Sequence, residues 1–367
     1  MKPSLTVVHF GPGGAEGHGG MGRFLRYLLP ALTEQGVQTR VVDAYGRGQK
    51  IWMPLYFAWA WLQLVGLGLG RSCDLVHIHM ASYGSVVRKL LLVVTARILG
   101  MPVVLHLHGS QFEQFMNGLL PWARRWVIAW MRHANRVIAI GYYWQDYLTG
   151  PLGLPMDQVV RVPNGVPDVA REGMHSDATG PCRILALGEL GVRKGTPELL
   201  IALASPALQN LSWHAVLAGN GPVPVYREQA EKLNLMDRLT FTGWVDQSRA
   251  WTLLKESQIL VLPSHQEGLP MAILEAMAAG LTIVTTPVGA IPDAIRDDET
   301  GLLVPSGDPK KLAEALARAI GEPQLRQRLG RAARSRFMAE FTIEETARIV
   351  IALYHSVLQT GISRTQT

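Results

Sequence analysis

Two carboxylates in the second half of the chain have the types and spacing to bind a polyhydroxylated ligand. Glu267 and Glu275 both lie in residues 262–280, where an apolar run ends, a short loop follows and a helical pattern begins. Carboxylates accept strong hydrogen bonds from hydroxyl groups such as those of sugars, and a helix N-terminus attracts phosphate. The segment therefore predicts a site for a diphosphate and a sugar. Alternatively, Glu267 caps the helix and Glu275 is a solvated helix residue.

Other loops of the second half follow strand-like runs and carry compatible groups. Arg193 and Lys194, followed by Gly195, lie between an apolar run and a helical pattern, where either cation could neutralise a diphosphate leaving group. The alternative for this pair is an ordinary surface position. Residues 219–222 and 243–245 each follow a further run. Loops of this kind at four strand ends predict a pocket for a nucleotide diphosphate sugar.

A glycine-rich loop at residues 11–22 follows the first apolar run. Gly17, Gly19 and Gly22, with Asp43 further on, match the spacing of a dinucleotide-binding fingerprint. Gly17 lies seven residues beyond Phe10, however, which is too far for the tight turn of that fingerprint. The loop is still suited to bringing backbone N–H groups close to an anion. A merely flexible loop is the alternative.

Two pairs of histidines end strand-like runs in the first half. His77 and His79 alternate along one run, and His106 and His108 along the next, so each pair should share one face of a strand. His108 stands at the tip, where it is best placed to reach a ligand, whereas His106 is expected inside the sheet. No cysteine or His-Glu-x-x-His motif accompanies them, so a zinc site is a minor alternative.

The elements that must position these groups alternate along the chain as short apolar runs and helical patterns, which predicts parallel sheets with crossover helices. We expect a doubly wound domain over 1–170, a polar linker over 171–181 and a second doubly wound domain over 182–340. Ligands of such sheets bind beyond the carboxyl ends of the strands. The expected strands are 5–10, 37–42, 75–78, 103–106, 136–139 and 159–162, then 183–187, 214–218, 239–242, 259–262, 282–285 and 302–304.

Composition supports this organisation and adds a charge asymmetry. The 367 residues are 48% hydrophobic and include two cysteines, which excludes a largely disordered chain, a disulfide framework and a cysteine zinc site. The net charge is +6: residues 1–170 hold 15 Lys and Arg against 8 Asp and Glu, a net of +7, and residues 171–367 carry a net of −1. An anionic partner of the first domain is therefore expected.

Residues 51–70 carry no charge and are long enough to cross a bilayer. The strand-like runs before and after them look like members of one sheet, which a spanning helix would separate. A helix of the first domain is therefore the favoured interpretation, and membrane insertion is the alternative. Its aromatic residues either face a bilayer interface or pack against the sheet. The apolar run at 5–10 is too short for a signal peptide.

Over nearly its whole length, the chain resembles the retaining glycosyltransferases of family 4, which have the two-domain GT-B fold. Beside the pair Glu267 and Glu275, the resemblance rests on the motifs Gly19-Gly20, His108, 163–166, 194–195, 219–222 and 289–293. It implies transfer of a sugar from a nucleotide diphosphate donor with retention at the anomeric carbon. It also implies no divalent metal, no cofactor and no enzyme nucleophile. The last helix, 341–367, would return to the first domain.

The resemblance also implies roles for individual residues. Glu267, His108, Lys194 and Arg193 would be the catalytic set, in which Glu267 holds the donor sugar and Lys194 the diphosphate. Many family members carry Arg where this chain has Glu189, and Arg193 is expected to supply the missing cation. The donor-binding set would be Gly19, Gly20, Glu275, Gly268, Leu269, Pro270, Met271, Ala272, Gly219, Asn220, Trp244 and Val245.

These observations predict a hexosyltransferase that uses a GDP- or UDP-sugar and a lipid-linked sugar acceptor in bacterial surface polysaccharide or glycolipid synthesis. We expect it in the cytoplasm, on the inner face of the cell membrane, in contact with anionic lipid rather than nucleic acid. A non-catalytic nucleotide-sugar-binding protein and a nucleotide-sugar epimerase are the alternatives. A phosphorylase would need a pyridoxal-binding lysine and a much longer chain.

Overall fold

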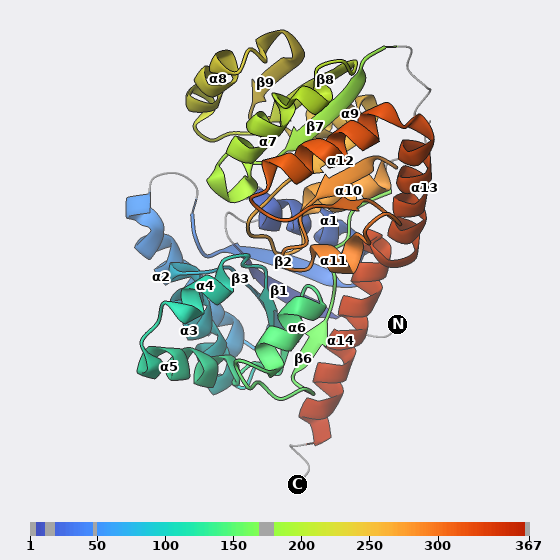
Figure 1. The fold of residues 1–367 in the computed structure, drawn as a ribbon. Helices are drawn as coiled ribbons and strands as arrows, with labels where there is room; N and C mark the ends of the chain where they lie inside the picture. Colours follow the sequence, from blue (N-terminus) through green and yellow to red (C-terminus); the bar gives the residue numbers. More distant parts are fainter. Residues whose placement is uncertain (1–4, 12–18, 47–49, 169–179, 364–367) are drawn as a thin grey trace. The chain divides into compact units, whose positions relative to one another are not determined.

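The computed structural model describes residues 5–11, 19–46, 50–168 and 180–363, and the chain forms two compact units (Figure 1). The first unit comprises residues 1–165 and 343–367, and the second comprises residues 166–342. Most of the expected linker, 171–181, lies outside the described residues. Within the second unit, Val166 pairs with Thr342 in an isolated parallel bridge. The second unit therefore begins and ends with neighbouring segments.

The first unit contains a parallel sheet with the strand order β2-β1-β3-β4-β5-β6. Its strands are β1 (Thr6–Gly11), β2 (Gln38–Asp43), β3 (Leu75–Met80), β4 (Val103–Leu107), β5 (Arg136–Ala139) and β6 (Val159–Arg161). Its α-helices are α1 (Gly19–Glu34), α2 (Met53–Leu69), α3 (Gly84–Ile98), α4 (Phe112–Asn117), α5 (Pro121–Met131), α6 (Tyr142–Thr149) and α14 (Ile343–Ser363). The strand order reverses between β1 and β3, and ligands of doubly wound sheets bind beyond the carboxyl ends of the strands at such a point.

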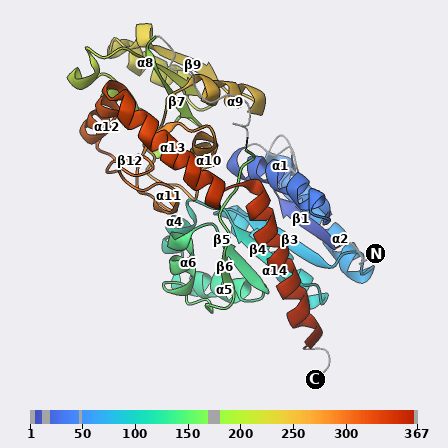
Figure 2. The same cartoon turned by 90° about the vertical axis from the view of Figure 1, so that its right-hand side faces the viewer.

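The C-terminal helix α14 belongs to the first unit and packs against α1 (Figure 2). Ala347, Val350, Tyr354 and Val357 are buried along one side of it. Their spacing of three or four residues places them on one stripe of the helix, which is the pattern that docks a helix on a core. The stripe explains why the last helix belongs to the first unit although it follows the second in sequence.

The second unit contains a parallel sheet with the strand order β12-β11-β10-β7-β8-β9. Its strands are β7 (Cys182–Leu187), β8 (Trp213–Ala218), β9 (Leu239–Gly243), β10 (Ile259–Leu262), β11 (Thr282–Thr285) and β12 (Leu302–Leu303). Its α-helices are α7 (Thr196–Leu203), α8 (Val223–Lys232), α9 (Gln247–Glu256), α10 (Met271–Ala278), α11 (Ile291–Ala294), α12 (Pro309–Gly321) and α13 (Pro323–Glu340). The predicted doubly wound α/β class is confirmed for both units, and the strand ends differ from the expected ones by at most two residues.

The uncharged segment 51–70 forms α2, which lies beside α3 on the first unit (Figure 1). Only Ala60, Leu64 and Leu67 of this helix are buried, whereas Trp59 is 63% exposed. The alternative that its aromatic residues pack against the sheet is therefore wrong for most of them. Among the described residues, no helix combines the length and apolar character that crossing a membrane requires.

Candidate functional site

The loops that carry the predicted cations and carboxylates leave neighbouring strands at the switch point of the second sheet. β7 pairs directly with β10, and the strand order reverses between them. The loop after β7 turns at Gly195, which has a φ of 69° and where an added Cβ would lie 2.0 Å from the carbonyl oxygen of Pro263. The N–H of His265 donates to the carbonyl of Arg193 at 2.9 Å. The two loops therefore interlock, and glycine is required at the point of closest approach.

Lys194 and Glu267 form the centre of the candidate site. The Lys194 ammonium donates to Oε1 of Glu267, and the Ser264 hydroxyl donates to the same oxygen at 2.8 Å. The Glu267 side chain is only 7% exposed, so its charge depends on these partners. Both hydrogen bonds are accepted by Oε1, one of the two carboxylate oxygens.

Arg193 lies beside this pair and is held in place by its own contacts. Its guanidinium lies 3.9 Å from Oε1 of Glu267 and 4.0 Å from Oε2 of Glu189. It also donates to the carbonyl of Gln266 at 3.2 Å. The structure thus brings Arg193, Lys194 and Glu267 together, while the exposed Glu189 carboxylate lies beside Arg193. An anion that displaces Glu189 from Arg193 would find both cations within reach.

Neither alternative interpretation of the two carboxylates fits the structure. The N-cap residue of α10 is Pro270, not Glu267. The Glu267 carboxylate instead accepts from Lys194 and Ser264. Glu275 is only 2% exposed, so it is not a solvated helix residue. Gly268 to Ala272, which belong to the predicted donor-binding set, form the buried segment before this helix and its first residues.

Further strand-end loops pack against these two. An added Cβ at Gly219 would lie 1.6 Å from the carbonyl oxygen of Gly188, and the carbonyl of Asn220 accepts from the N–H of Leu190 at 2.7 Å. The N–H of Gly219 donates in turn to the carbonyl of Gly243 at 2.8 Å. Beyond Gly243, the side chain of Trp244 is 60% exposed and Val245 is half-buried. The loops after β7, β8 and β9 therefore form one continuous rim.

The loop after β11 supports the Glu267 loop from the other side. An added Cβ at Gly289, which has a φ of 57°, would lie 2.0 Å from the carbonyl oxygen of Glu267. The N–H of Ala290 donates to the carbonyl of Gly268 at 2.8 Å, and the Thr286 hydroxyl donates to the carbonyl of Ser264. The position of Glu267 thus depends on close contacts from two neighbouring loops.

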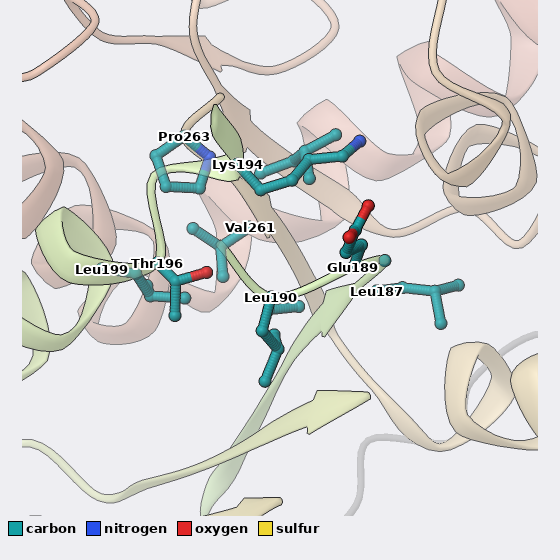
Figure 3. Close-up of a pocket in the computed structure, with 11 residues that line it drawn as sticks. Leu187, Glu189, Leu190, Lys194, Thr196, Leu199, Val261 and Pro263 are labelled. Atoms are coloured by element: carbon teal, nitrogen blue, oxygen red, sulfur yellow. The ribbon is translucent and has the colours of Figure 1, made fainter. Parts of the chain in front are cut away.

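A small hollow, partly open to solvent, lies along the loop after β7 (Figure 3). Figure 3 shows the charged ends of Lys194 and Glu189 on the same side of it. Its lining residues are Ala186, Leu187, Gly188, Glu189, Leu190, Lys194, Thr196, Leu199, Val261, Leu262 and Pro263.

The remaining predicted residues belong to the first unit. Gly19 and Gly20 are exposed at the start of α1, while residues 12–18 of the glycine loop lie outside the described residues. His108 follows β4 and is partly exposed, whereas His106 is fully buried, as expected. That Gly19, Gly20 and His108 join Glu267 in one site stays a prediction.

The sequence reasoning missed several polar partners. Ser264 precedes Glu267 by three residues, a spacing that favours a side-chain contact in a tight loop. Its hydrogen bond with Glu267 was therefore predictable from the sequence. His265 contacts Glu198 at 3.1 Å and Ser306 at 2.9 Å, which ties the Glu267 loop to α7 and to the segment before α12. His9 and Tyr354 contact the predicted histidines of the first unit. No local pattern indicates these long-range partners.

Comparisons with known proteins agree with this architecture. The family described as glycosyl transferase 4-like domain matches residues 5–165, and the family described as glycosyl transferases group 1 matches residues 175–336. A glycogen synthase of Mycobacterium tuberculosis is 27% identical over 306 residues, which cover 80% of this chain and 72% of the relative.

Solved structures show the same fold. A sucrose-phosphate synthase from Thermosynechococcus elongatus superposes with a TM-score of 0.79 at 21% identity, over 97% of this chain and all of that one. HepE of Anabaena, in complex with UDP, gives a TM-score of 0.74 at 16% identity, over 96% of this chain and all of HepE. Together, the family matches, which span most of the chain, and the two doubly wound units lead to one conclusion: the chain belongs to the family 4 type of glycosyltransferases, with the GT-B fold.

Proposed function

We propose that the protein is a retaining hexosyltransferase that transfers a hexose from a UDP- or GDP-sugar to a lipid-linked sugar acceptor, without a divalent metal. The observation that carries this proposal is the contact of Lys194 with the buried Glu267 at the switch point of the second sheet. Ligands of doubly wound sheets bind at such points. HepE, which shares the fold, has been solved with UDP, and this supports a nucleoside diphosphate as the leaving group.

In this proposal, Lys194 and Arg193 stabilise the charge that develops on the departing diphosphate. Preorganised cations aimed at a developing charge make a large contribution to catalysis because they need no reorganisation during the reaction. The N-terminus of α10 adds the partial positive charge of its N–H groups. The arrangement supplies positive charge from the protein itself, which is why we propose that no metal is required.

The carboxylates hold the sugar groups in this proposal. Contacts with Lys194 and Ser264 occupy Oε1 of Glu267, so Oε2 is the oxygen that would accept from hydroxyls of the donor sugar. Glu275 would hold the ribose, and the rim near Trp244 and Val245 would lie beside the base. His108, Gly19 and Gly20 of the first unit would complete the site near the transferred sugar and the diphosphate.

The decisive experiment is release of nucleoside diphosphate from a panel of UDP- and GDP-sugars with purified Glu267→Gln. Loss of a charged hydrogen bond to the sugar in the transition state corresponds to about 1.5–3 kcal/mol, so we expect turnover to fall about 10- to 150-fold. Glu198→Gln is the matched control, because it removes the same charge from a residue that binds His265 of the same loop.

Unchanged turnover in Glu267→Gln would place the chemistry at another site. Donor binding without turnover in the wild-type protein, for every donor and acceptor tried, would favour the non-catalytic alternative. For Arg193→Ala, we expect weaker donor binding because a cation is lost beside the diphosphate. Unchanged donor binding would show that Arg193 does not replace the family arginine absent at Glu189.

The proposed lipid acceptor rests on the surface of the first unit. Helices α2, α3 and α5 lie together (Figure 1), and they expose Trp59 at 63%, Ile98 at 80% and Trp122 at 70%. Residues 50–136, which contain these helices, hold nine Lys and Arg, of which Lys89 is buried, against two Asp and Glu. Exposed aromatics beside basic side chains suit the interface of an anionic bilayer. We therefore propose peripheral contact with the inner face of the cell membrane.

Co-sedimentation with vesicles tests this contact. We expect stronger binding to vesicles that contain phosphatidylglycerol than to neutral phosphatidylcholine vesicles, and weaker binding as salt rises. Trp59→Ser and Trp122→Ser should each reduce binding, whereas Trp244→Ser, an exposed tryptophan of the second unit, is the matched control. Equal, salt-insensitive binding to both kinds of vesicle would contradict electrostatic docking.

A further inference from the structure

Five histidines of the first unit lie on one face of its sheet. They are His9 on β1, His77 and His79 on β3, His106 on β4 and His108 directly after β4. The strand register places His9 opposite His77 and His79 opposite His106. The first four are completely buried and His108 is partly exposed. Phe24 of α1 and Tyr354 of α14 cover this face through ring contacts.

Hydrogen bonds divide the histidines into two chains. In the first chain, Nδ1 of His9 lies 3.1 Å from Nε2 of His79, and Nδ1 of His79 lies 3.0 Å from Nε2 of His108. In the second chain, the Tyr354 hydroxyl lies 2.6 Å from Nδ1 of His77, and Nε2 of His77 lies 3.2 Å from Nδ1 of His106. The first chain therefore connects a buried strand to the partly exposed His108.

Each ring of the first chain is neutral. Burial lowers the pKa of His9 to about 3 and the pKa of His79 well below its usual value. Although the residue His108 is partly exposed, desolvation of its imidazole by the surrounding protein lowers its pKa to about 3 as well. A neutral imidazole has one N–H donor and one acceptor nitrogen. His79 bonds through both of its nitrogens, so it donates to one neighbour and accepts from the other. The hydrogen bonds from His9 to His79 and from His79 to His108 therefore run in the same direction, either both toward His108 or both toward His9.

The end of the chain at His9 decides that direction. Nε2 of His9 is buried and has no hydrogen-bond partner within the described part of the protein. Buried N–H groups without an acceptor are rare in proteins, because their desolvation is not compensated. The proton of His9 is therefore on Nδ1, which donates to Nε2 of His79. His79 then donates from Nδ1 to Nε2 of His108, and the proton of His108 must be on its own Nδ1.

A metal ion is the competing explanation for the cluster. Two sets of three histidines, His9 with His77 and His79, and His79 with His106 and His108, have ring nitrogens within 4.8 Å of one another. A metal ion must lie in the plane of each ligand ring, at about 2.0–2.1 Å from nitrogen for zinc. The rings of His77 and His79 are stacked 4.3 Å apart at 17°, and those of His106 and His108 are 3.9 Å apart at 27°. Near-parallel stacked rings do not point at a common centre, so the geometry favours the hydrogen-bonded chain.

We propose that His79 and His9 are positioning residues that hold His108 in the Nδ1–H tautomer and thereby make it a hydrogen-bond donor at the carboxyl end of the first sheet. The tautomer of His108 follows from the hydrogen bonds of His9 and His79 alone, whatever reaction the protein catalyses. Its use rests on the proposed function: His108 donates to an oxygen of the transferred sugar or the acceptor, and it does not accept a proton as a general base through Nδ1.

NMR of the full-length protein with ¹⁵N-labelled histidine tests the tautomer, since long-range ¹H–¹⁵N correlations distinguish Nδ1–H from Nε2–H. We expect His108 to carry Nδ1–H in the wild-type protein. His79→Phe removes the donor, and the signals of His108 should then report a mixture of both tautomers. His79→Asn places an amide N–H near the position of the lost Nδ1–H, and it should restore the Nδ1–H form.

His77→Phe is the matched control, because His77 is buried on the same face but belongs to the second chain. It should leave His108 in the Nδ1–H form. An Nε2–H tautomer of His108 in the wild-type protein, or an unchanged tautomer in His79→Phe, would overturn the proposal. Titration of the purified protein with Zn²⁺ and Co²⁺ is the second arm. Stoichiometric binding that disappears in His79→Phe would identify a metal site instead.

The kinetic readout separates this inference from the proposed function. His79→Phe is expected to lower kcat about 10-fold, the effect of losing one hydrogen bond to the reacting sugar, with little change in KM for the donor. His79→Asn should recover most of the loss. If the NMR results for His108 are as expected but the protein has no transferase activity, the positioning role of His79 and His9 stands and the proposed function is refuted. A normal kcat in His79→Phe, despite a changed tautomer, would refute the use of His108 as a donor.

Discussion

Acidification should destabilise the first unit through His9 by an amount that the structure allows to be calculated. His9 is completely buried, and burial lowers its pKa to about 3 from the 6.5 of an exposed histidine. Below pH 6.5, the unfolded chain therefore binds a proton at His9 that the folded chain does not bind. The associated stability is fully present above pH 6.5 and is lost progressively as the pH falls toward 3.

At pH 5, the loss from His9 is about 2 kcal/mol relative to pH 8, since 1.5 pH units below the unfolded pKa correspond to about 1.36 kcal/mol each. The pKa of His9 in the folded protein lies well below pH 5, so His9 stays neutral there. The size of the loss is therefore set by protonation of His9 in the unfolded chain. His9→Phe removes this contribution. We therefore expect the variant to lose about 2 kcal/mol less than the wild type between pH 8 and pH 5.

Urea unfolding followed by pulsed hydrogen exchange and mass spectrometry gives the free energy of unfolding of each unit separately. Peptides from β1 and β3 report on the first unit, and peptides from β7 and β10 serve as the internal control in the second. An equal loss of stability in both proteins between pH 8 and pH 5, within about 0.5 kcal/mol, would refute the reasoning. It would mean that His9 is accessible to protons in the folded state.

Three further outcomes follow from the site in the second unit. Gly289→Ala should destabilise that unit and weaken donor binding in calorimetry, because its Cβ would lie 2.0 Å from the carbonyl oxygen of Glu267, whereas Gly191→Ala meets no atom within 4 Å and should be neutral. Lys194→Met should cost about 3 kcal/mol by leaving the Glu267 carboxylate without its main partner. In urea unfolding, the double variant Lys194→Met with Glu267→Gln should lose less free energy of unfolding than the sum of the losses in the two single variants. Losses that add exactly would show that the two residues are not coupled. Transferase activity should survive treatment with EDTA, and a loss that Mg²⁺ or Mn²⁺ restores would contradict metal independence.

Much of the site could be predicted because its residues follow strands directly. Glu267 and Lys194 each lie a few residues beyond an apolar run, and parallel strands bring their carboxyl ends to one edge of a sheet. The prediction that these residues lie together needed only the two runs to be neighbours. The contact itself, and the fact that Ser264 shares the same carboxylate oxygen, depend on loop conformations that Gly195 and Gly289 permit through close backbone contacts.

The aromatic helix α2 shows where a local pattern leaves the answer open. A helix that is apolar on nearly every side has no preferred face, so its sequence does not indicate which side chains are buried. The structure buries Ala60, Leu64 and Leu67 and leaves Trp59 exposed, because the sheet and α3 contact only one side of it. The burial of Glu275 likewise depends on the elements packed around α10.

The sequence by itself determined the α/β class, the strands found among the described residues and the loops that carry the candidate chemistry, because hydrophobic periodicity and strand-end motifs are properties of neighbouring residues. Only the tertiary structure decided the order of the strands in each sheet, and with it the partners of the histidines. His9 and His79 are 70 residues apart, and they meet because β1 lies next to β3. Strand order is set by the packing of whole elements, and this is why the histidine chain could be recognised only in the folded protein.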